Sequence, residues 1–344
     1  MAHEQDGEQA PAPVVAEGAD RGSHDLLGPV RGPSDRGGSQ SVTTVLVAFG
    51  ANVLVAAAKS AAAVVTGSAS ILAEAAHSWA DAGNEVFLLI ASRRSRRPPD
   101  LAHPFGHGRE AYVWSLFAAL GLFVAGAAVS VTHGVQELLS PKPASHFAAG
   151  YAVLAISFVF EGISFLQSAR QARGEAQSMG RDLIEHILAT SDPALRAVFA
   201  EDSAALAGLL IAAAGLAARQ LTGSPIPDAA GSVLVGALLG ITAIVLINRN
   251  RQFLIGQEAD PRVRAAAIAA LLDAPEVARV TYLRLEIVGP RMVSVIGDVD
   301  LSGDDTESHL AVRLRALEAK ISTSPAVAGA VLSLSAPDEP TLAV

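Results

Sequence analysis

Residues 70–90 read SILAEAAHSWADAGNEVFLLI, an apolar stretch that carries an imidazole at His77 and a carboxylate at Asp81. Residues four apart lie on the same face of a helix, so both side chains point the same way. The stretch is long enough to cross a bilayer, where an ionisable side chain is costly and indicates a function. It therefore predicts a membrane-spanning helix with a functional polar face.

The composition favours a membrane protein over a large, alanine-rich soluble helical protein. The chain has 344 residues, 51% of them hydrophobic, and several apolar runs have the length of a membrane span. It contains no cysteine, so a transition-metal site must use His, Asp, Glu or backbone oxygens. Lys and Arg form no long run, so we expect no nucleic-acid partner.

The predicted fold is an all-α, six-helix transmembrane bundle followed by a small α+β domain in the cytoplasm. Apolar runs bounded by Gly, Pro and charged residues define the spans. The six candidate spans are residues 42–65, 70–91, 111–139, 147–167, 193–218 and 228–247.

The remaining segments have a different character. Residues 1–40 are rich in Gly, Pro, Asp, Glu and Ser and predict a disordered acidic tail without the apolar core of a signal peptide. We expect the transmembrane domain at 41–250, the cytoplasmic domain at 251–337 and a short tail at 338–344.

Positive charge predicts the orientation in the membrane. Basic residues gather in the loops after spans two and four and in the segment after span six, which places these loops and both termini in the cytoplasm. The acidic tail lacks the Arg-rich character of an organelle presequence, which favours a bacterial plasma membrane. The basic residues are Arg93, Arg94, Arg96, Arg97, Arg109, Arg170, Arg173, Arg181, Arg249 and Arg251.

The last third of the chain predicts helices and strands of a small domain. Residues 277–288 and 292–301 alternate Val and Ile with polar residues, and Gly289-Pro290 forms a turn between them. Amphipathic helices are predicted at 260–272 and 306–321, and a third strand at 327–334. This order of elements indicates a sheet with helices on one face.

The second span carries a stripe of polar side chains. They are Glu74, His77, Asp81, Asn84 and Glu85, and lipid would leave such a stripe unsatisfied. An imidazole with carboxylates suits Zn²⁺ and neighbouring divalent metals. The alternative is a polar network that only ties helices together, and this role fits Glu74 and Glu85 best.

The fifth span carries a second acidic feature. Glu201 and Asp202 are adjacent in an apolar run and point about 100° apart on a helix, so one of them faces any given site directly. With His77 and Asp81 they would complete the four N/O ligands that Zn²⁺ favours. Lys59 in the first span could pair with Glu74 or with Glu161 of the fourth span.

The loop after the second span is a separate candidate metal site. Residues 98–109 read PPDLAHPFGHGR, and Asp100, His103 and His107 form a His/carboxylate cluster of the metal-binding type. The alternative is a cytoplasmic turn whose histidines bond to backbone groups. No span contains a His-Glu-x-x-His pair, so a membrane metalloprotease is the weaker prediction and we expect no enzyme.

Three segments together resemble the cation diffusion facilitator family. They are LAEAAHSWAD at 72–81, HPFGHGR at 103–109, and Asp228 at the start of the sixth span. Within the family, the chain is most similar to the zinc transporter 9-like branch. That similarity rests on Asn84 and on HGV at 133–135, EDSAA at 201–205 and LIGQ at 254–257.

The resemblance implies a homodimer of six-span subunits with a ferredoxin-like cytoplasmic domain. It implies proton-coupled export of divalent cations, usually Zn²⁺, with Mn²⁺, Co²⁺, Cd²⁺ and Fe²⁺ as other candidates. It implies a transport site at His77 and Asp81 with fifth-span ligands, and a loop site at Asp100, His103 and His107. Asn84, Glu161 and Asp228 are secondary candidates.

The chain departs from the family pattern in the fifth span. The family pairs a histidine with an aspartate four residues later, but Val198 and Phe199 stand at the possible histidine positions. Glu201 and Asp202 are the remaining candidates. This departure leaves an alternative function, a non-transporting membrane scaffold or heterodimer partner with a degenerate site. The C-terminal domain has one histidine, His309, so we expect it to serve dimerisation rather than metal regulation.

Overall fold

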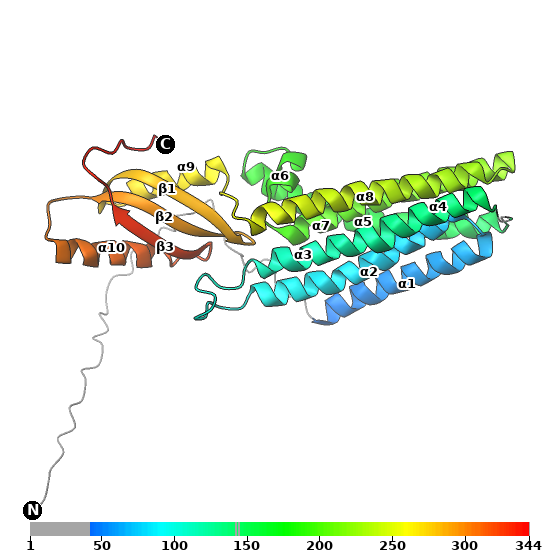
Figure 1. Cartoon of the computed structure of the whole chain (residues 1–344), viewed down its shortest axis with the longest axis horizontal. Helices are drawn as coiled ribbons and strands as arrows, with labels where there is room; N and C mark the ends of the chain where they lie inside the picture. The colour runs from blue at the N-terminus through cyan, green and yellow to red at the C-terminus, as the bar shows by residue number, and fades with distance from the viewer. Residues whose placement is uncertain (1–41, 142, 144, 344) are drawn as a thin grey trace, which may run out of the picture.

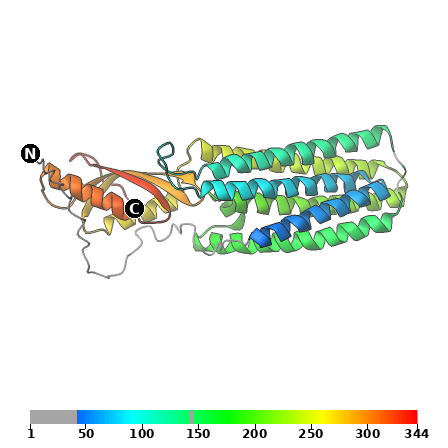
Figure 2. The same cartoon turned by 90° about the horizontal axis from the view of Figure 1, so that it is seen from below.

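The computed structural model describes residues 42–141, 143 and 145–343, and the predicted tail at 1–40 lies outside them. A bundle of long helices and a smaller α+β domain lie end to end (Figure 1). Turned by 90°, the long helices run side by side along the bundle (Figure 2).

The long helices match the predicted apolar runs closely. The third run forms a single rod in which a π-helical turn joins two α-helices. The predicted fifth and sixth spans are α7 and α8, and both begin within two residues of the predicted positions. The predicted fourth and sixth spans, α5 and α8, extend further than predicted at their C-terminal ends. The elements are α1 (Val42–Thr66), α2 (Ala69–Ser95), α3 (Glu110–Gly121), η1 (Leu122–Ala128), α4 (Val129–Leu139), α5 (Phe147–Ser178), α7 (Pro193–Thr222) and α8 (Ile226–Leu254).

Four of these helices are long and apolar enough to cross a membrane: the rod at Glu110–Leu139, α5, α7 and α8. In α1 the described apolar part is the shorter segment Asn52–Thr66, and α2 carries three acidic residues in its first five turns. The four helices confirm the predicted helical membrane domain.

Local sequence signals explain where the key helices begin. Asp192 caps α7 by accepting hydrogen bonds from the backbone N–H groups of Ala194 and Leu195, with Pro193 in the first turn. Ser68 caps α2 by accepting from the N–H of Ile71. These caps set the start of the two helices that carry the predicted site residues.

Two features of the helical part were absent from the sequence prediction. The short helix α6 (Leu183–Ala189) lies between α5 and α7. The π-helical turn η1 packs closely on α8, where a Cβ on Gly126 would come within 2.9 Å of the Leu239 side chain. A larger side chain there would require the Leu239 side chain to shift.

The C-terminal part forms the predicted α+β domain. Strand order is β1-β2-β3, with β1 and β2 antiparallel and β2 and β3 parallel. Side chains from the helices and the sheet, among them Ile268, Leu285, Val299 and Leu317, build one apolar core. The elements are α9 (Pro261–Leu272), β1 (Val277–Gly289), β2 (Met292–Leu301), α10 (Glu307–Ile321) and β3 (Val327–Leu334).

The turn between β1 and β2 contacts the helical bundle. Arg291 in this turn has its Nη2 atom 2.7 Å from Glu175 Oε1 of α5, and its backbone N–H donates to Ser191 Oγ at 3.0 Å. Glu286 of β1 pairs with Arg109, directly before α3. The sheet therefore touches the bundle beside the loop that follows α2 (Figure 1).

Candidate metal centre

The polar stripe of α2 lies inside the bundle. Glu74, His77 and Asn84 are buried, and Asp81 is half-buried. The Nε2 atom of His77 is 3.0 Å from Oδ2 of Asp81, as the four-residue spacing predicts. An imidazole and a carboxylate therefore meet in a part of the bundle that water scarcely reaches.

The two acidic residues of α7 are both buried and turn toward different helices. Glu201 Oε1 accepts a 2.9 Å hydrogen bond from Asn84 Nδ2 of α2. Asp202 Oδ2 accepts hydrogen bonds from Ser164 Oγ at 2.9 Å and Ser168 Oγ at 3.3 Å, both on α5. Glu201 thus faces α2 and Asp202 faces α5, in agreement with the angle between neighbouring helix positions.

Several buried polar atoms on α2 have no hydrogen-bond partner among the described residues. Buried polar groups are nearly always satisfied, so such a concentration on one helix needs an explanation. Carboxylate oxygens and imidazole nitrogens are the donor atoms that divalent cations take. The atoms are Glu74 Oε1, His77 Nδ1, Asp81 Oδ1, Asn84 Oδ1 and Glu85 Oε2.

The predicted ligands of α2 and α7 do not close into one compact group. Within the described part of the chain, one set of three or more His, Cys, Asp or Glu residues has its ligand atoms all within 4.8 Å of one another, and it is the loop set. His77, Asp81, Glu201 and Asp202 do not form such a set in this arrangement, in which Asp202 is turned toward α5.

The loop set consists of Asp100, His103 and His107. Asp100 Oδ1 is 3.1 Å from His103 Nδ1, Asp100 Oδ2 is 3.1 Å from His107 Nε2, and the two imidazole rings are 4.1 Å apart. Hydrogen bonds from His107, and from the backbone and side chain of His103, lower the pKa of Asp100 to about 2. Two imidazoles around an ionised carboxylate fit a zinc ion.

The secondary candidates have structural partners. Glu161 Oε1 of α5 lies 3.6 Å from the Nζ atom of Lys59, which also lies 3.3 Å from Glu74 Oε2. The predicted pairing of Lys59 is therefore confirmed, with both acids.

Asp228 lies at the end of the bundle opposite the C-terminal domain, away from the His77 pair. Its carboxylate accepts hydrogen bonds from Ser68 Oγ at 2.7 Å and the N–H of Ala69 at 2.8 Å. The Oδ2 atom of Asp228, which accepts from Ala69, also lies 2.9 Å from Arg219 Nη1. The same Arg219 nitrogen is 3.2 Å from Glu137 Oε1. Asp228 thus fixes the start of α2 rather than joining the predicted ligands.

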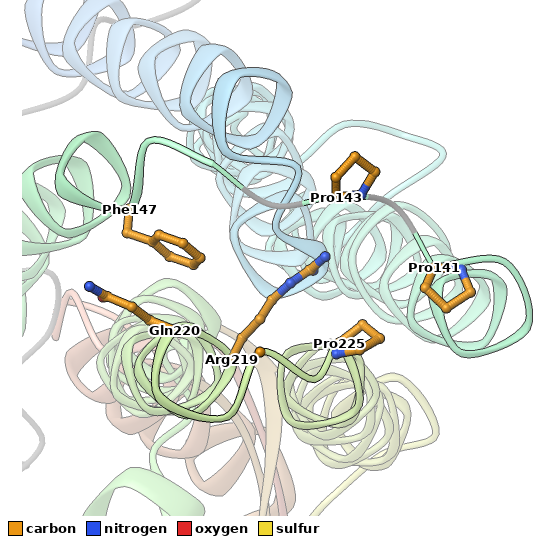
Figure 3. A pocket seen from close by; sticks show the side chains of 7 residues that line it. Pro141, Pro143, Phe147, Arg219, Gln220 and Pro225 are labelled. Carbon is orange, nitrogen blue, oxygen red and sulfur yellow. The ribbon is translucent and has the colours of Figure 1, made fainter.

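A pocket of roughly 420 Å³ lies at this same end, beside Arg219. Figure 3 shows Gln220, near the end of α7, beneath Phe147 at the start of α5, while the guanidinium of Arg219 extends toward Pro143. Pro141, Pro143 and Pro225 complete most of the wall. The pocket contains none of the predicted metal ligands.

Sequence reasoning missed the role of two arginines in the helices. Arg219 joins the Asp228 cluster. Arg196 is buried in α7, donates to Thr190 O at 2.9 Å and Asn250 Oδ1 at 2.7 Å, and lies over the Phe253 ring. A charged residue within or beside an apolar run was the available signal for both.

Long apolar helices that carry buried N/O donors, joined to an α+β domain, define a helical membrane protein with a C-terminal domain. Comparison with known families agrees: the model described as "Cation efflux transmembrane domain" matches residues 45–255. The chain belongs to the cation efflux family, and the expected family is confirmed.

Named relatives support the expected branch as well. The chain is 36% identical over 270 residues to "Metal tolerance protein C4" of Arabidopsis thaliana, which covers 78% of this chain and 58% of that protein. It is 33% identical over 259 residues to the mouse "Proton-coupled zinc antiporter SLC30A9, mitochondrial", covering 75% of this chain and 46% of that protein. It is 23% identical over 240 residues to the Bacillus subtilis "Manganese efflux system protein MneP", covering 70% of this chain and 77% of that protein.

The chain carries the cation efflux transmembrane domain of this family. The chain spans about half the length of the first two relatives, 58% and 46%. The names of these relatives differ in the metal, zinc in one and manganese in another.

Proposed function

We propose that the protein exports divalent cations, Zn²⁺ foremost, in exchange for protons. The proposal includes six membrane crossings by α1, α2, the α3–η1–α4 rod, α5, α7 and α8. It also includes cytoplasmic termini, a homodimer held by the ferredoxin-like C-terminal domain, and a bacterial plasma membrane. The basic loops after the even spans support this orientation.

One observation supports the proposal most: the buried stripe of α2 faces Glu201 of α7. His77 and Asp81 lie 3.0 Å apart, and Glu201 hydrogen-bonds to the same helix through Asn84. Imidazole nitrogen and carboxylate oxygens inside a membrane bundle are ligands for a divalent cation in transit. Mn²⁺, Co²⁺, Cd²⁺ and Fe²⁺ would compete for the same set.

Alternating access accounts for the separation of the ligands. In the cytoplasm-facing state, Zn²⁺ would draw α2 and α7 together through His77, Asp81 and Asp202, with Glu201 as a fourth ligand. Rocking of the helices would then open the site to the other side. Ligands bind metal only when deprotonated, so protons on that side displace the ion and return the carrier.

Flux into proteoliposomes tests the transport function. The full-length protein is reconstituted, and Zn²⁺ uptake is followed with an enclosed dye under a pH gradient and without one. We expect uptake to require the gradient and to be lost in Asp81→Asn. Asp273→Asn, an exposed acid at the end of α9, is the matched control and should transport normally.

The same experiment separates the transporter from a scaffold. The missing histidine of α7 and the open ligand arrangement favour the scaffold as the second candidate. A scaffold would show no uptake and no Zn²⁺ binding once Asp100, His103 and His107 are replaced by alanine. Retained binding together with flux that is insensitive to Asp81→Asn would contradict the assigned site.

A further inference from the structure

Lys59 is a buried cation that transport through His77 and Asp81 does not use. It lies in α1, in the interior of the bundle, and its side chain has no exposed surface. A lysine inside a membrane bundle is costly unless paired, and it indicates a function.

Three helices meet at its ammonium group. The Nζ atom donates to Ser78 Oγ at 2.8 Å and lies 3.3 Å from Glu74 Oε2, both on α2. It also lies 3.6 Å from Glu161 Oε1 on α5. One charge therefore spans two carboxylates on two helices, and three donors can serve these three partners.

The two carboxylates are close to the proposed ligands. Glu74 precedes His77 by three residues on the same face of α2, and Glu161 precedes Ser164, the donor to Asp202, by three residues on α5. Glu74 also reaches α7, where its Oε1 atom lies so close to Gly208 that a Cβ there would clash with it. Both acids therefore lie one helical turn from His77 on α2 and from the Ser164 donor to Asp202 on α5.

We propose that Lys59 determines metal specificity by occupying Glu74 and Glu161, so that the transported ion meets only the His77 set. This inference rests on the proposed function. With Lys59 present, the ion finds one imidazole and the carboxylates of Asp81, Glu201 and Asp202. Without it, two further hard oxygen ligands become available.

The expected consequence is a change in metal preference. Imidazole suits Zn²⁺, whereas carboxylate-rich sites suit Mn²⁺. The variant Lys59→Met removes the ammonium group and keeps the length of the aliphatic part of the side chain. It should favour the ion that accepts more oxygen ligands. Coupling between close, desolvated charges corresponds to at least about a tenfold change in binding, so the Mn²⁺/Zn²⁺ affinity ratio should rise by that factor.

Equilibrium binding of the two metals tests the inference. The full chain in nanodiscs, with Asp100, His103 and His107 replaced by alanine, is dialysed against Zn²⁺ and Mn²⁺ together, and bound metal is measured by mass spectrometry. Lys59→Met should shift the ratio toward Mn²⁺, and Lys320→Met, whose amine pairs with Glu276 on the C-terminal domain, should leave it unchanged. An unchanged ratio in a folded Lys59→Met protein would overturn the inference.

A neutral cluster keeps the test decisive if Lys59→Met does not fold. In Lys59→Met/Glu74→Gln/Glu161→Gln no buried charge is left unpaired by the change, and the wild-type ratio should return. A shifted ratio in this triple variant would also overturn the inference, because the two acids would then matter without the lysine. Absence of any metal binding in the parent protein is a different result, since it contradicts the proposed function instead.

Discussion

Asn84 of α2 donates a 2.9 Å hydrogen bond to Glu201 of α7, and this bond joins the two helices that carry the proposed ligands. Glu201 is buried next to Asp202, in the span where the family pattern has a histidine. The amide orients the Glu201 carboxylate toward α2, which is the side of the bundle that holds His77 and Asp81.

Replacing Asn84 by leucine should weaken metal binding at the membrane site. The partner that orients a ligand typically contributes 10–100-fold to metal affinity, so we expect Zn²⁺ affinity to fall by about tenfold or more. The measurement is Zn²⁺ titration of the full chain without the loop ligands. Asn52→Leu is the matched control, because Asn52 makes an equivalent 2.6 Å bond to Glu85 between α1 and α2. Equal losses in both variants would mean that Asn84 serves only helix packing.

Arg219 and Asp228 should contribute strongly to stability. The pair is buried, and Arg219→Gln removes the guanidinium that lies against the carboxylates of Asp228 and Glu137 at the pocket in Figure 3. Breaking a buried ion pair by removing one partner costs about 3–5 kcal/mol. We expect thermal unfolding in detergent to shift down accordingly. Arg284→Gln, which removes an exposed guanidinium from Glu286 while Arg109 still pairs with that carboxylate, should cost less than about 1 kcal/mol; a loss of similar size in both variants would contradict the assignment.

The helices and strands were predictable because their signals are local. The run predicted at 111–139 is the rod at Glu110–Leu139, and the strand predicted at 292–301 is β2. The helix α6 was not predicted, because seven residues in a polar loop give little periodicity and tertiary contacts at His186 and Ile187 hold it. The π-helical turn η1 was not predicted either, since its apolar residues continue the pattern of the helices on both sides of it.

The site was predictable only where its partners are neighbours along one helix. The His77–Asp81 contact follows from helical spacing. The Asn84–Glu201 bond joins residues 117 positions apart, and the Asp228 carboxylate reaches Ser68 across 160 positions. No local pattern carries information about such pairs, because the fold alone brings them together. Lys59 could be assigned its acidic partners because buried charge demands them.

Gly108 should be essential for the contact between the loop and the C-terminal domain. A Cβ at this position would lie 2.6 Å from the backbone oxygen of Val288 and 2.8 Å from Gly289 Cα, and backbone atoms cannot give way as a side chain can. Overpacking of this kind costs about 1–3 kcal/mol, so Gly108→Ala should loosen the domain. Limited proteolysis between α8 and β1 measures the effect. Gly174→Ala, in an exposed turn of α5 with open space around it, should be neutral or stabilising by up to about 1 kcal/mol.

Asp100 should remain ionised across the physiological range. Its pKa is lowered from 3.8 to about 2, chiefly by the hydrogen bond from His107. A carboxyl whose pKa is lower in the folded state stabilises the loop above pH 3.8, and this contribution is lost as the pH falls through 2. Between pH 5 and 8 Asp100 therefore has no proton to release when a metal binds.

The protons that Zn²⁺ displaces from the loop should come from the imidazoles alone, since metal ligands bind deprotonated. Calorimetry at pH 6 in two buffers of different ionisation heat counts them, using the full chain with His77→Ala and Asp81→Ala. We expect the parent to release at most two protons, one from each imidazole, and Asp100→Asn to bind at least about tenfold more weakly. Asp305→Asn, which removes the carboxylate of the exposed Asp305–His309 pair, should change neither quantity. Release of more than two protons by the parent would show that the Asp100 carboxyl is also protonated before the metal binds.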